Sequence, residues 1–422
     1  MSKDESEEEE KQQTFFNFNS QQNQNDNSPK PVESPKPKDD EKLNNDNKNT
    51  FLQKKTKPEQ IIEKEFVSYK DYYTTNGVRD PGIEGRKASR IIFLRSFNNW
   101  VKASMINKYC RQLGRDLSIL ELCCGKGGDL DKYLINKIKL FVGADISGEL
   151  LENAMTRLEK IKNEKYSDHF QTKCYFIRED LSNPQNKFLE KIDKKYWFDL
   201  VSCQFALHYH FESEQRLNAF LRNVSSKLCD GGFFIGTIIE DNVIVKRLRN
   251  RKNIPNKYIN EKLTFGNEFY SVKFSQKNFS KKNGPYGIKY GFYLEDSLDK
   301  RDESGQIKSV KEYLIIFEEF VKLCKEYDLY LVEKKNFLNF YQENLKNNQY
   351  EKLFYKMVNL NSSSINQQWE IVQLYRIFAF RKGKQFANNE NSNNNFKYVP
   401  FLSQTNIPFT NYEPELIQSS FK

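Results

Sequence analysis

The order of apolar runs along this chain constrains its fold more than any other feature. From Leu117 onward, short runs rich in β-forming residues alternate with segments whose apolar residues recur at helical spacing, such as Leu150, Ala154 and Leu158. That alternation is typical of a parallel sheet whose strands are joined by crossover helices. The runs that we interpret as strands cover residues 118–122, 140–146, 173–179, 198–204 and 232–239. We therefore expect an α/β fold with a doubly wound, mainly parallel sheet, in which ligands bind beyond the carboxyl ends of the strands.

A second group of segments follows this pattern and is rich in aromatic residues. Residues 263–274 and 286–298 have aromatics at near-alternate positions, which favours extended segments that cover the ligand face. The other elements that we expect are a helix near 310–327, a strand at 329–333, a helix over 336–345 and a final apolar segment at 369–380. Together these segments predict an additional lobe beside the sheet.

Both ends of the chain are too polar to fold by themselves. Residues 1–60 include a run of four Glu and a Gln/Asn tract with almost no branched aliphatic residues, so apolar burial cannot offset the loss of chain entropy. A second Asn-rich stretch covers 388–395. The length of 422 residues suggests two or three domains. The composition instead predicts a disordered low-complexity tail over 1–65, one folded domain over 66–382 and an Asn-rich C-terminal tail over 383–422.

Charge is divided unevenly between the N-terminal tail and the rest of the chain. Residues 1–60 carry ten Lys against thirteen acidic residues, whereas residues 61–422 carry 57 basic residues against 44 acidic ones. A basic body favours a polyanionic partner such as nucleic acid or a nucleoside triphosphate, with a merely solvated surface as the alternative. No stretch approaches the roughly 20 apolar residues of a membrane span, and the acidic N-terminus does not resemble a signal peptide. We therefore expect a soluble intracellular protein.

Cysteine and histidine usage argues against metals and disulfides. The seven Cys are scattered without a CxxC pair, mostly inside apolar runs, and the chain has only three His. We therefore expect neither a metal site nor a structural disulfide.

A glycine-rich loop follows the first expected strand. The sequence reads ELCCGKGGD over residues 121–129, and a helix is expected directly after it. Small residues let the backbone approach a ligand closely, and a helix N-terminus offers unpaired N–H groups. Asp145 ends the second strand twenty residues after Gly125, where its carboxylate can accept both hydroxyls of a ribose. The combination indicates a nucleoside cofactor, and the alternative is an ordinary strand-to-helix turn with an Asp cap.

The acid before the loop narrows the choice of cofactor. A dinucleotide site expects G-x-G-x-x-G around a pyrophosphate, whereas here Glu121 precedes a shorter turn. A carboxylate at that point can bind the ammonium group of an amino-acid cofactor, which points to S-adenosyl-L-methionine. Asp180, which ends the third expected strand, would then lie near the adenine and its exocyclic amine.

Seven motifs occur in one order along the chain. They are FNNWVK at 97–102, GKGGDL at 125–130, SCQFALHYHFES at 202–213, FFIGT at 233–237, FGNE at 265–268, YGFYLE at 290–295, and QWE at 368–370 with LYRIFAF at 374–380. In sequence and in order they resemble the mRNA cap guanine-N7 methyltransferases of eukaryotes. The resemblance implies a class I, Rossmann-like, S-adenosylmethionine-dependent methyltransferase with an inserted cap-pocket lobe, acting on N7 of the terminal guanine of GpppRNA.

The resemblance also implies roles for individual residues. The cofactor contacts would be Lys102, Gln204 and Tyr209, with Cys123 where the family has a glycine, beside Glu121, Asp145 and Asp180. The cap contacts would be Asn98 and Asn99, then Lys126, Lys132 and Arg157 at the triphosphate bridge, and His208, Glu295 and Tyr375 around the guanine. Glu295 is expected to accept from both N1–H and the N2 amine, and Tyr375 to close the pocket by stacking. Each position has a plain alternative as a solvated surface residue or a packed core residue.

The same resemblance predicts the chemistry and its setting. Guanine N7 already exposes a lone pair and loses no proton on methylation, so no residue is assigned as catalytic. We expect the capped end of nascent mRNA as substrate, the RNA polymerase II tail or other capping enzymes as candidate partners, no membrane, and a location in the nucleus. Two alternatives stay open: a methyltransferase of the same fold acting on tRNA or protein, and a catalytically silent RNA-binding module.

Overall fold

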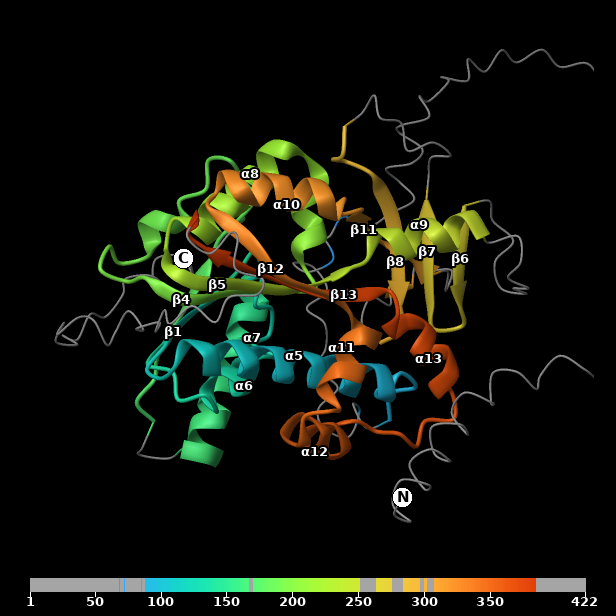
Figure 1. The fold of residues 1–422 in the computed structure, drawn as a ribbon, viewed down its shortest axis with the longest axis horizontal. Coiled ribbons are helices and arrows are strands. Elements are labelled where there is room, and N and C mark those ends of the chain that lie inside the picture. The colour runs from blue at the N-terminus through green and yellow to red at the C-terminus, as the bar shows by residue number, and fades with distance from the viewer. Residues whose placement is uncertain are drawn as a thin grey trace, which may run out of the picture. The chain divides into compact units, whose positions relative to one another are not determined.

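The computed structural model describes residues 88–166, 170–250, 263–274, 284–296, 300–301 and 307–384, together with Ser68, Tyr72 and Gly85 (Figure 1). The predicted tails lie outside these residues, apart from Gly383 and Lys384. Among the helices that the structure describes, none is both long and apolar enough to cross a lipid bilayer.

A seven-stranded sheet forms the centre of the fold, in the order β12-β13-β5-β4-β1-β2-β3. The first five strands of the chain run parallel, and β13 pairs antiparallel with both β5 and β12. The bounds are Ser118–Leu122 (β1), Leu140–Asp145 (β2), Lys173–Arg178 (β3), Phe198–Gln204 (β4), Leu228–Ile239 (β5), Leu329–Asn336 (β12) and Tyr375–Lys382 (β13). The predicted mainly parallel sheet is thereby confirmed, with β5 beginning earlier than position 232.

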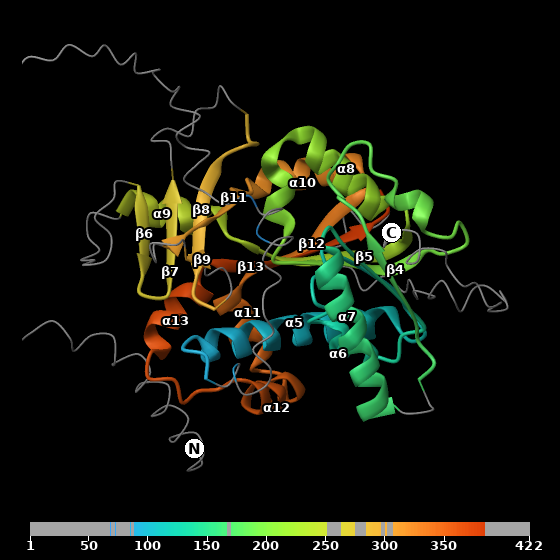
Figure 2. The same cartoon turned by 180° about the vertical axis from the view of Figure 1, so that it is seen from behind.

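Helices cover both faces of this sheet, which explains why its central strands are apolar on both sides. In Figures 1 and 2, α8 and α10 lie on one face, whereas α5, α6 and α7 lie on the other. The helices span Ile92–Leu113 (α5), Leu130–Leu134 (α6), Gly148–Ile161 (α7), Glu214–Ser225 (α8), Asp241–Asn250 (α9), Phe317–Glu326 (α10), Phe337–Asn344 (α11), Asn348–Met357 (α12) and Ile365–Val372 (α13). The apolar stripe predicted from Leu150, Ala154 and Leu158 is buried on α7.

The additional lobe is a four-stranded antiparallel sheet in the order β11-β8-β7-β6. Its strands are Thr264–Asn267 (β6), Tyr270–Phe274 (β7), Lys289–Leu294 (β8) and Val310–Tyr313 (β11). A short pair, Lys300–Arg301 (β9) with Ile307–Lys308 (β10), precedes β11. Figures 1 and 2 place this lobe at one end of the large sheet, next to α9 and α13. The two predicted extended segments are therefore confirmed as β-structure by β6, β7 and β8, and positions 297 and 298 of the second segment lie outside the described residues.

The predicted helix near 310–327 is wrong in its first part. Residues Val310–Tyr313 form strand β11, which pairs with β8 so that Glu312 lies opposite Tyr290. Helix α10 begins only at Phe317. Pairing with β8, a partner distant along the chain, overrides the local helical pattern. The final apolar segment also divides, because α13 ends at Val372 and β13 begins at Tyr375.

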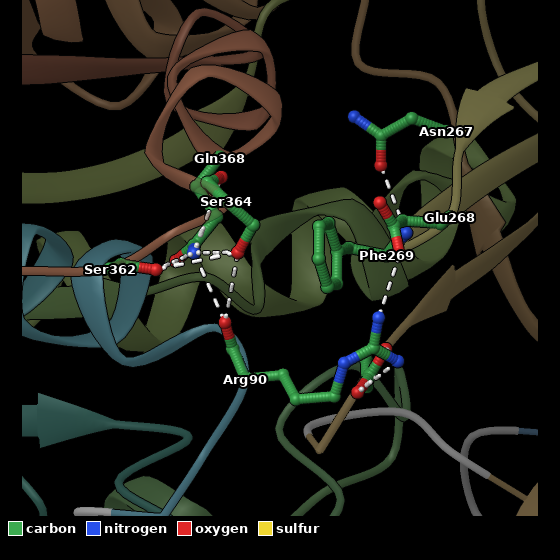
Figure 3. A network of polar contacts seen from close by, with 8 residues as sticks. Arg90, Asn267, Glu268, Phe269, Ser362, Ser364 and Gln368 are labelled. Carbon is green, nitrogen blue, oxygen red and sulfur yellow. Dashed lines mark hydrogen bonds and ion pairs between the residues drawn. The ribbon is translucent and has the colours of Figure 1, made fainter.

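A polar network around the start of α5 ties the lobe to the large sheet's helices (Figure 3). The Gln368 side chain is fully buried; its Oε1 accepts from Leu94 N at 2.9 Å, and its Nε2 donates to Arg90 O at 3.1 Å. The same Nε2 reaches Ser362 Oγ at 2.8 Å and Ser364 Oγ at 2.9 Å. The side-chain amide of Gln368 on α13 thus forms hydrogen bonds with backbone groups at the N-terminal end of α5.

Replacement of this amide should destabilise the fold. Gln368→Ala leaves buried backbone groups without partners and should lower the free energy of unfolding by about 1–3 kcal/mol. Gln367→Ala, an exposed neighbour on the same helix, is the matched control and should change it by less than about 0.5 kcal/mol. Urea denaturation measures both, and equal losses would contradict an anchoring role for Gln368.

Candidate active site

The loop after β1 turns sharply because three of its residues have left-handed backbone conformations. The φ angles are +58° at Cys123, +52° at Gly125 and +64° at Gly127. A Cβ atom at Gly127 would lie 2.5 Å from Leu130 Cδ1, so only glycine suits that position. Cys123 is a non-glycine residue in a conformation that costs roughly 1–2 kcal/mol. The loop therefore passes close to the carboxyl ends of β1, β2 and β4.

A cavity opens beside this loop, with an empty volume of about 760 Å³ that includes space open to solvent. Its walls bring together residues from the loop after β1, from the carboxyl ends of β2, β3 and β4, from the first turn of α7 and from positions 209–210. The predicted site residues among them are Cys123, Asp145, Asp180, Gln204 and Tyr209. This convergence at the carboxyl edge of a parallel sheet is where the fold predicts a ligand.

Asp145 closes the end of β2 and holds the loop at the same time. Its Oδ2 accepts from Gly125 N at 2.8 Å and its Oδ1 from Ser147 N at 3.0 Å. Burial raises the pKa of this carboxyl group, while those backbone N–H donors lower it. A carboxylate offers about four acceptor positions, so with donors from Gly125, Ser147 and Ile146 the group still has room to accept from a hydroxyl in the cavity.

Two other residues of the cavity wall are also fixed by neighbours. Asp180 Oδ1 accepts from Ser182 Oγ at 3.0 Å and lies 3.4 Å from Arg216 Nη2. Gln204 Nε2 donates to Ser202 Oγ at 2.8 Å, and its Oε1 accepts from Thr237 Oγ1 at 3.0 Å. These contacts hold both side chains in place at the cavity.

A buried ionic cluster lies beneath the loop. Asp129 Oδ1 is 2.9 Å from Lys102 Nζ and 2.7 Å from Lys132 Nζ. Burial raises the pKa of the Asp129 carboxyl group. The two ammonium groups lower it by more, so the pKa lies below the usual range. Neighbouring Glu121 has a buried Oε2 without a hydrogen-bond partner, and burial together with Asp129 raises its pKa. Neither Lys102 nor Glu121 is among the described residues that line the cavity.

The predicted phosphate contacts lie around the same loop but already have partners. Arg157 Nε donates to Lys126 O at 3.0 Å, and Lys132 Nζ donates to Gly128 O at 3.0 Å. Both cations therefore brace the loop backbone. Of the predicted asparagines on α5, Asn99 is exposed, whereas Asn98 has a buried Oδ1 without a hydrogen-bond partner.

A second group of buried polar residues joins the large sheet to the lobe. His208 Nε2 is 3.3 Å from Glu312 Oε1, and Tyr290 donates its hydroxyl to Glu312 Oε2 at 2.7 Å. Burial raises the pKa of Glu312 to about 8 and lowers that of His208 to about 3. Both His208 nitrogens are buried without a well-formed hydrogen bond. This pair has polar groups that a bound ligand can satisfy.

Aromatic rings connect this group to the cavity. The rings of His208 and Tyr209 lie 4.1 Å apart, and those of Phe205 and Tyr375 meet edge to face at 5.1 Å. Tyr209 and Phe205 also line the cavity. Burial, followed by the charge of Glu312, raises the pKa of Tyr375. The structure thus brings together the predicted residues His208, Tyr209 and Tyr375, with Glu312 as a member that sequence reasoning missed.

Glu295 lies elsewhere in the lobe. It follows the end of β8, and both of its carboxylate oxygens are 3.2 Å from Arg90 Nη1. Arg90 Nη2 also pairs with Glu268 at 2.7 Å. These contacts give Glu295 a part in attaching the lobe to the segment that precedes α5. Glu312 was not among the predicted site residues because residues 310–327 were expected to be helical. The β-rich run that begins at Val310 is the sequence signal that could have indicated it.

Cys123, Cys203 and His210 come together although they are far apart in sequence. Their potential ligand atoms all lie within 4.8 Å of one another, and Cys123 Sγ is 3.5 Å from His210 Nε2. The expectation of no metal site rested on spacing along the chain, which does not register this cluster.

The parallel sheet, the glycine-rich loop and the acids at the ends of β1, β2 and β3 define a class I, S-adenosylmethionine-dependent methyltransferase. The model of the mRNA (guanine-N(7))-methyltransferase domain matches residues 55–383, and the chain belongs to that family.

Relatives in plants and fungi agree with this assignment. The mRNA cap guanine-N(7) methyltransferase 1 of Oryza sativa subsp. japonica is 34% identical over 348 residues, covering 80% of this chain and 87% of its own length. The mRNA cap guanine-N(7) methyltransferase 1 of Arabidopsis thaliana is 36% identical, and the match covers 71% of this chain and 77% of the relative's length. The mRNA cap guanine-N(7) methyltransferase of Schizosaccharomyces pombe is 33% identical, and the match covers 73% of this chain and 80% of the relative's length.

The raised pKa of Glu312 predicts a pH-dependent contribution to stability. Between pH 4.5 and about 8 the folded chain keeps a proton on Glu312 that the unfolded chain releases. The wild-type protein should therefore lose unfolding free energy as pH rises through this window. In Glu312→Gln that loss should be absent. Urea denaturation of both proteins across the window tests this, and a difference between them that stays constant with pH would contradict the raised pKa.

Proposed function

We propose that this chain transfers the methyl group of S-adenosyl-L-methionine to N7 of the terminal guanine of GpppRNA, which yields m7GpppRNA and S-adenosylhomocysteine. The observation that carries the residue assignment is the buried Glu312 carboxyl group beside His208, whose ring contacts Tyr209 in the wall of the cavity. A purine-reading group and a nucleoside cavity therefore have a common wall.

The cavity residues fit the cofactor. Asp145 would accept the ribose hydroxyls with its remaining lone pairs, and Asp180 would lie at the adenine. Outside the lining of the cavity, the unpartnered Oε2 of Glu121 would accept from the ammonium group of the methionine part, and Lys102 would face its carboxylate while it keeps its ion pair with Asp129. When bound, S-adenosylmethionine supplies a methyl group on a positively charged sulfur, which is a strong leaving group.

Glu312 supplies the reason for guanine selectivity. A carboxylate can accept from both N1–H and the N2 amine of guanine, a pair of donors that adenine does not offer. At neutral pH the raised pKa favours a proton on Glu312 in the empty pocket, so guanine binding should release that proton. A base without these donors would leave the buried carboxyl group unpaired, which costs a few kcal/mol.

The protein's contribution to the transfer is positioning. Guanine N7 needs no general base, and His208 is neutral because burial lowers its pKa to about 3. Phe205 and Tyr375, whose rings meet edge to face at 5.1 Å, would form one aromatic wall on which the base packs, and His208 would act as a second wall or as a hydrogen-bond donor. Orientation of this kind is worth up to about 7–11 kcal/mol when geometry is good.

The setting of the reaction is a proposal that rests on family membership. We propose a nuclear location and capped nascent mRNA as substrate, with the RNA polymerase II tail or other capping enzymes as candidate partners.

A pair of isosteric variants tests the guanine reader. Glu312→Gln should lower kcat/KM on GpppRNA by about ten- to a hundredfold, since a charge-assisted hydrogen bond is worth about 1.5–3 kcal/mol. Glu295→Gln, the matched control in the same lobe, should have a small effect because its partner Arg90 is largely exposed. Cofactor affinity should be unchanged in both.

The same variants on an inosine cap sharpen this test. Inosine lacks the N2 amine, so half of the proposed interaction is already absent and the loss caused by Glu312→Gln should shrink. An equal loss on both caps, or a larger loss from Glu295→Gln, would contradict Glu312 as the guanine reader and return the role to the original prediction.

Salt dependence tests the phosphate contacts. If Lys126 meets the triphosphate bridge, Lys126→Ala should reduce the slope of log affinity for GpppRNA against log salt by about one. Lys160→Ala is the control, because Lys160 is an exposed cation on α7 paired only at 3.7 Å with Glu164. Titrations at several salt concentrations measure both slopes, and identical slopes for the two variants would remove Lys126 from the phosphate site.

A further inference from the structure

Three potential metal ligands converge at the inner wall of the cofactor cavity. Cys123 follows β1, Cys203 lies in β4, and His210 lies in the 3₁₀ helix Leu207–Glu212 (η4). Parallel pairing of β1 with β4 sets Leu122 opposite Cys203, which brings the two cysteines near each other. The potential ligand atoms of all three residues lie within 4.8 Å of one another.

The distances suit tetrahedral zinc. Zn–S bonds of about 2.3 Å and Zn–N bonds of about 2.0–2.1 Å separate sulfur from nitrogen by about 3.6 Å and two sulfurs by about 3.8 Å. The observed separation of Cys123 Sγ from His210 Nε2 is 3.5 Å. The remaining two distances are at most 4.8 Å, so shifts of about 1 Å would complete a three-residue site of the Cys₂His type.

The fourth coordination position would open to the cavity. Cys123 and His210 line that cavity, whereas Cys203 is fully buried behind them. His210 is only 5% exposed, and its Nδ1 is buried without a hydrogen-bond partner. Three protein ligands with one open position differ from a closed structural site, so an ion here would share space with whatever enters the cavity.

The backbone at Cys123 adds an independent observation. Its φ of +58° is a conformation that glycine adopts without strain, and the related methyltransferase motif has glycine at this point. A thiol at a strained position facing a cavity is a candidate for function.

We propose that Cys123, Cys203 and His210 bind one thiophilic divalent cation, represented by Zn²⁺, and that this ion and the cofactor exclude each other. Binding replaces the two thiol protons, which pass to solvent, and involves no change of oxidation state. The enzyme would then be inhibited by zinc through its own cofactor site.

Cobalt substitution tests the metal site directly. Co²⁺ alone is titrated into the full chain under a non-thiol reductant, and the thiolate-to-cobalt absorption band is followed. Saturation at one ion per chain and displacement by Zn²⁺ are expected. Cys123→Gly removes one ligand and should abolish the band, and glycine adopts the left-handed backbone conformation at this position without strain. Cys203→Ala removes a second ligand and should also abolish the band. Cys174→Ser, which changes a thiol on β3 outside the cluster, should leave the band intact.

Thermal unfolding of each variant confirms that it is folded. Absence of the band in the wild-type protein, or its persistence in folded Cys123→Gly, would overturn the site.

Calorimetry with S-adenosylhomocysteine then tests exclusion. The apparent Kd should rise in proportion to added Zn²⁺ in the wild-type protein and stay constant in Cys123→Gly. A zinc-independent Kd in a protein that shows the cobalt band would overturn the exclusion. The calorimetry rests on the proposed cofactor site, whereas the cobalt titration does not. Failure of the metal site therefore shows in the cobalt band, and failure of the cofactor site shows only in the calorimetry.

Discussion

The interaction on which the site depends is the buried pairing of Asp129 with Lys102 and Lys132. It joins α5 to the segment that begins α6, directly under the glycine-rich loop, with N–O distances of 2.9 and 2.7 Å. Loss of one partner from such a buried pair typically costs about 3–5 kcal/mol, because it leaves a charge without compensation. The loop, the acid Glu121 and the ends of β1 and β2 are therefore held as one unit, and Asp145 fixes the other side of the loop through Gly125 N.

The lobe brings a second constraint to the same edge of the sheet. Pairing of β11 with β8 sets Glu312 opposite Tyr290, and the lobe's position brings that carboxyl group to His208 on the large sheet's side. Gln368 and Arg90 attach the lobe's surroundings to α5. Selectivity for guanine thus depends on two parts of the fold that are remote in sequence but close at one pocket.

Much of this arrangement could be predicted from the sequence, because its causes are local. Apolar runs separated by amphipathic helices predicted all five parallel strands, and small residues before an acid at Asp145 predicted the cofactor loop. The role proposed for Glu312 depends on a partner that is distant along the chain, since β11 pairs with β8, and its only local signal is the β-rich run that begins at Val310. Glu295 belongs to the more recognisable motif, yet its carboxylate faces Arg90. The Cys123, Cys203 and His210 cluster likewise results from strand pairing and has no spacing signature.

The most direct measurement of the central claim is methyl transfer from labelled S-adenosylmethionine to two RNAs that differ at one atom of the cap. The first carries a guanine cap and the second carries 7-deazaguanine, in which a C–H group replaces N7. Label is expected in the first RNA alone, and the second RNA should act as a competitive inhibitor because it keeps the N1–H and N2 donors for Glu312. Equal labelling of both RNAs, or of an adenine-capped RNA, would contradict transfer to N7 of a guanine held by this pocket.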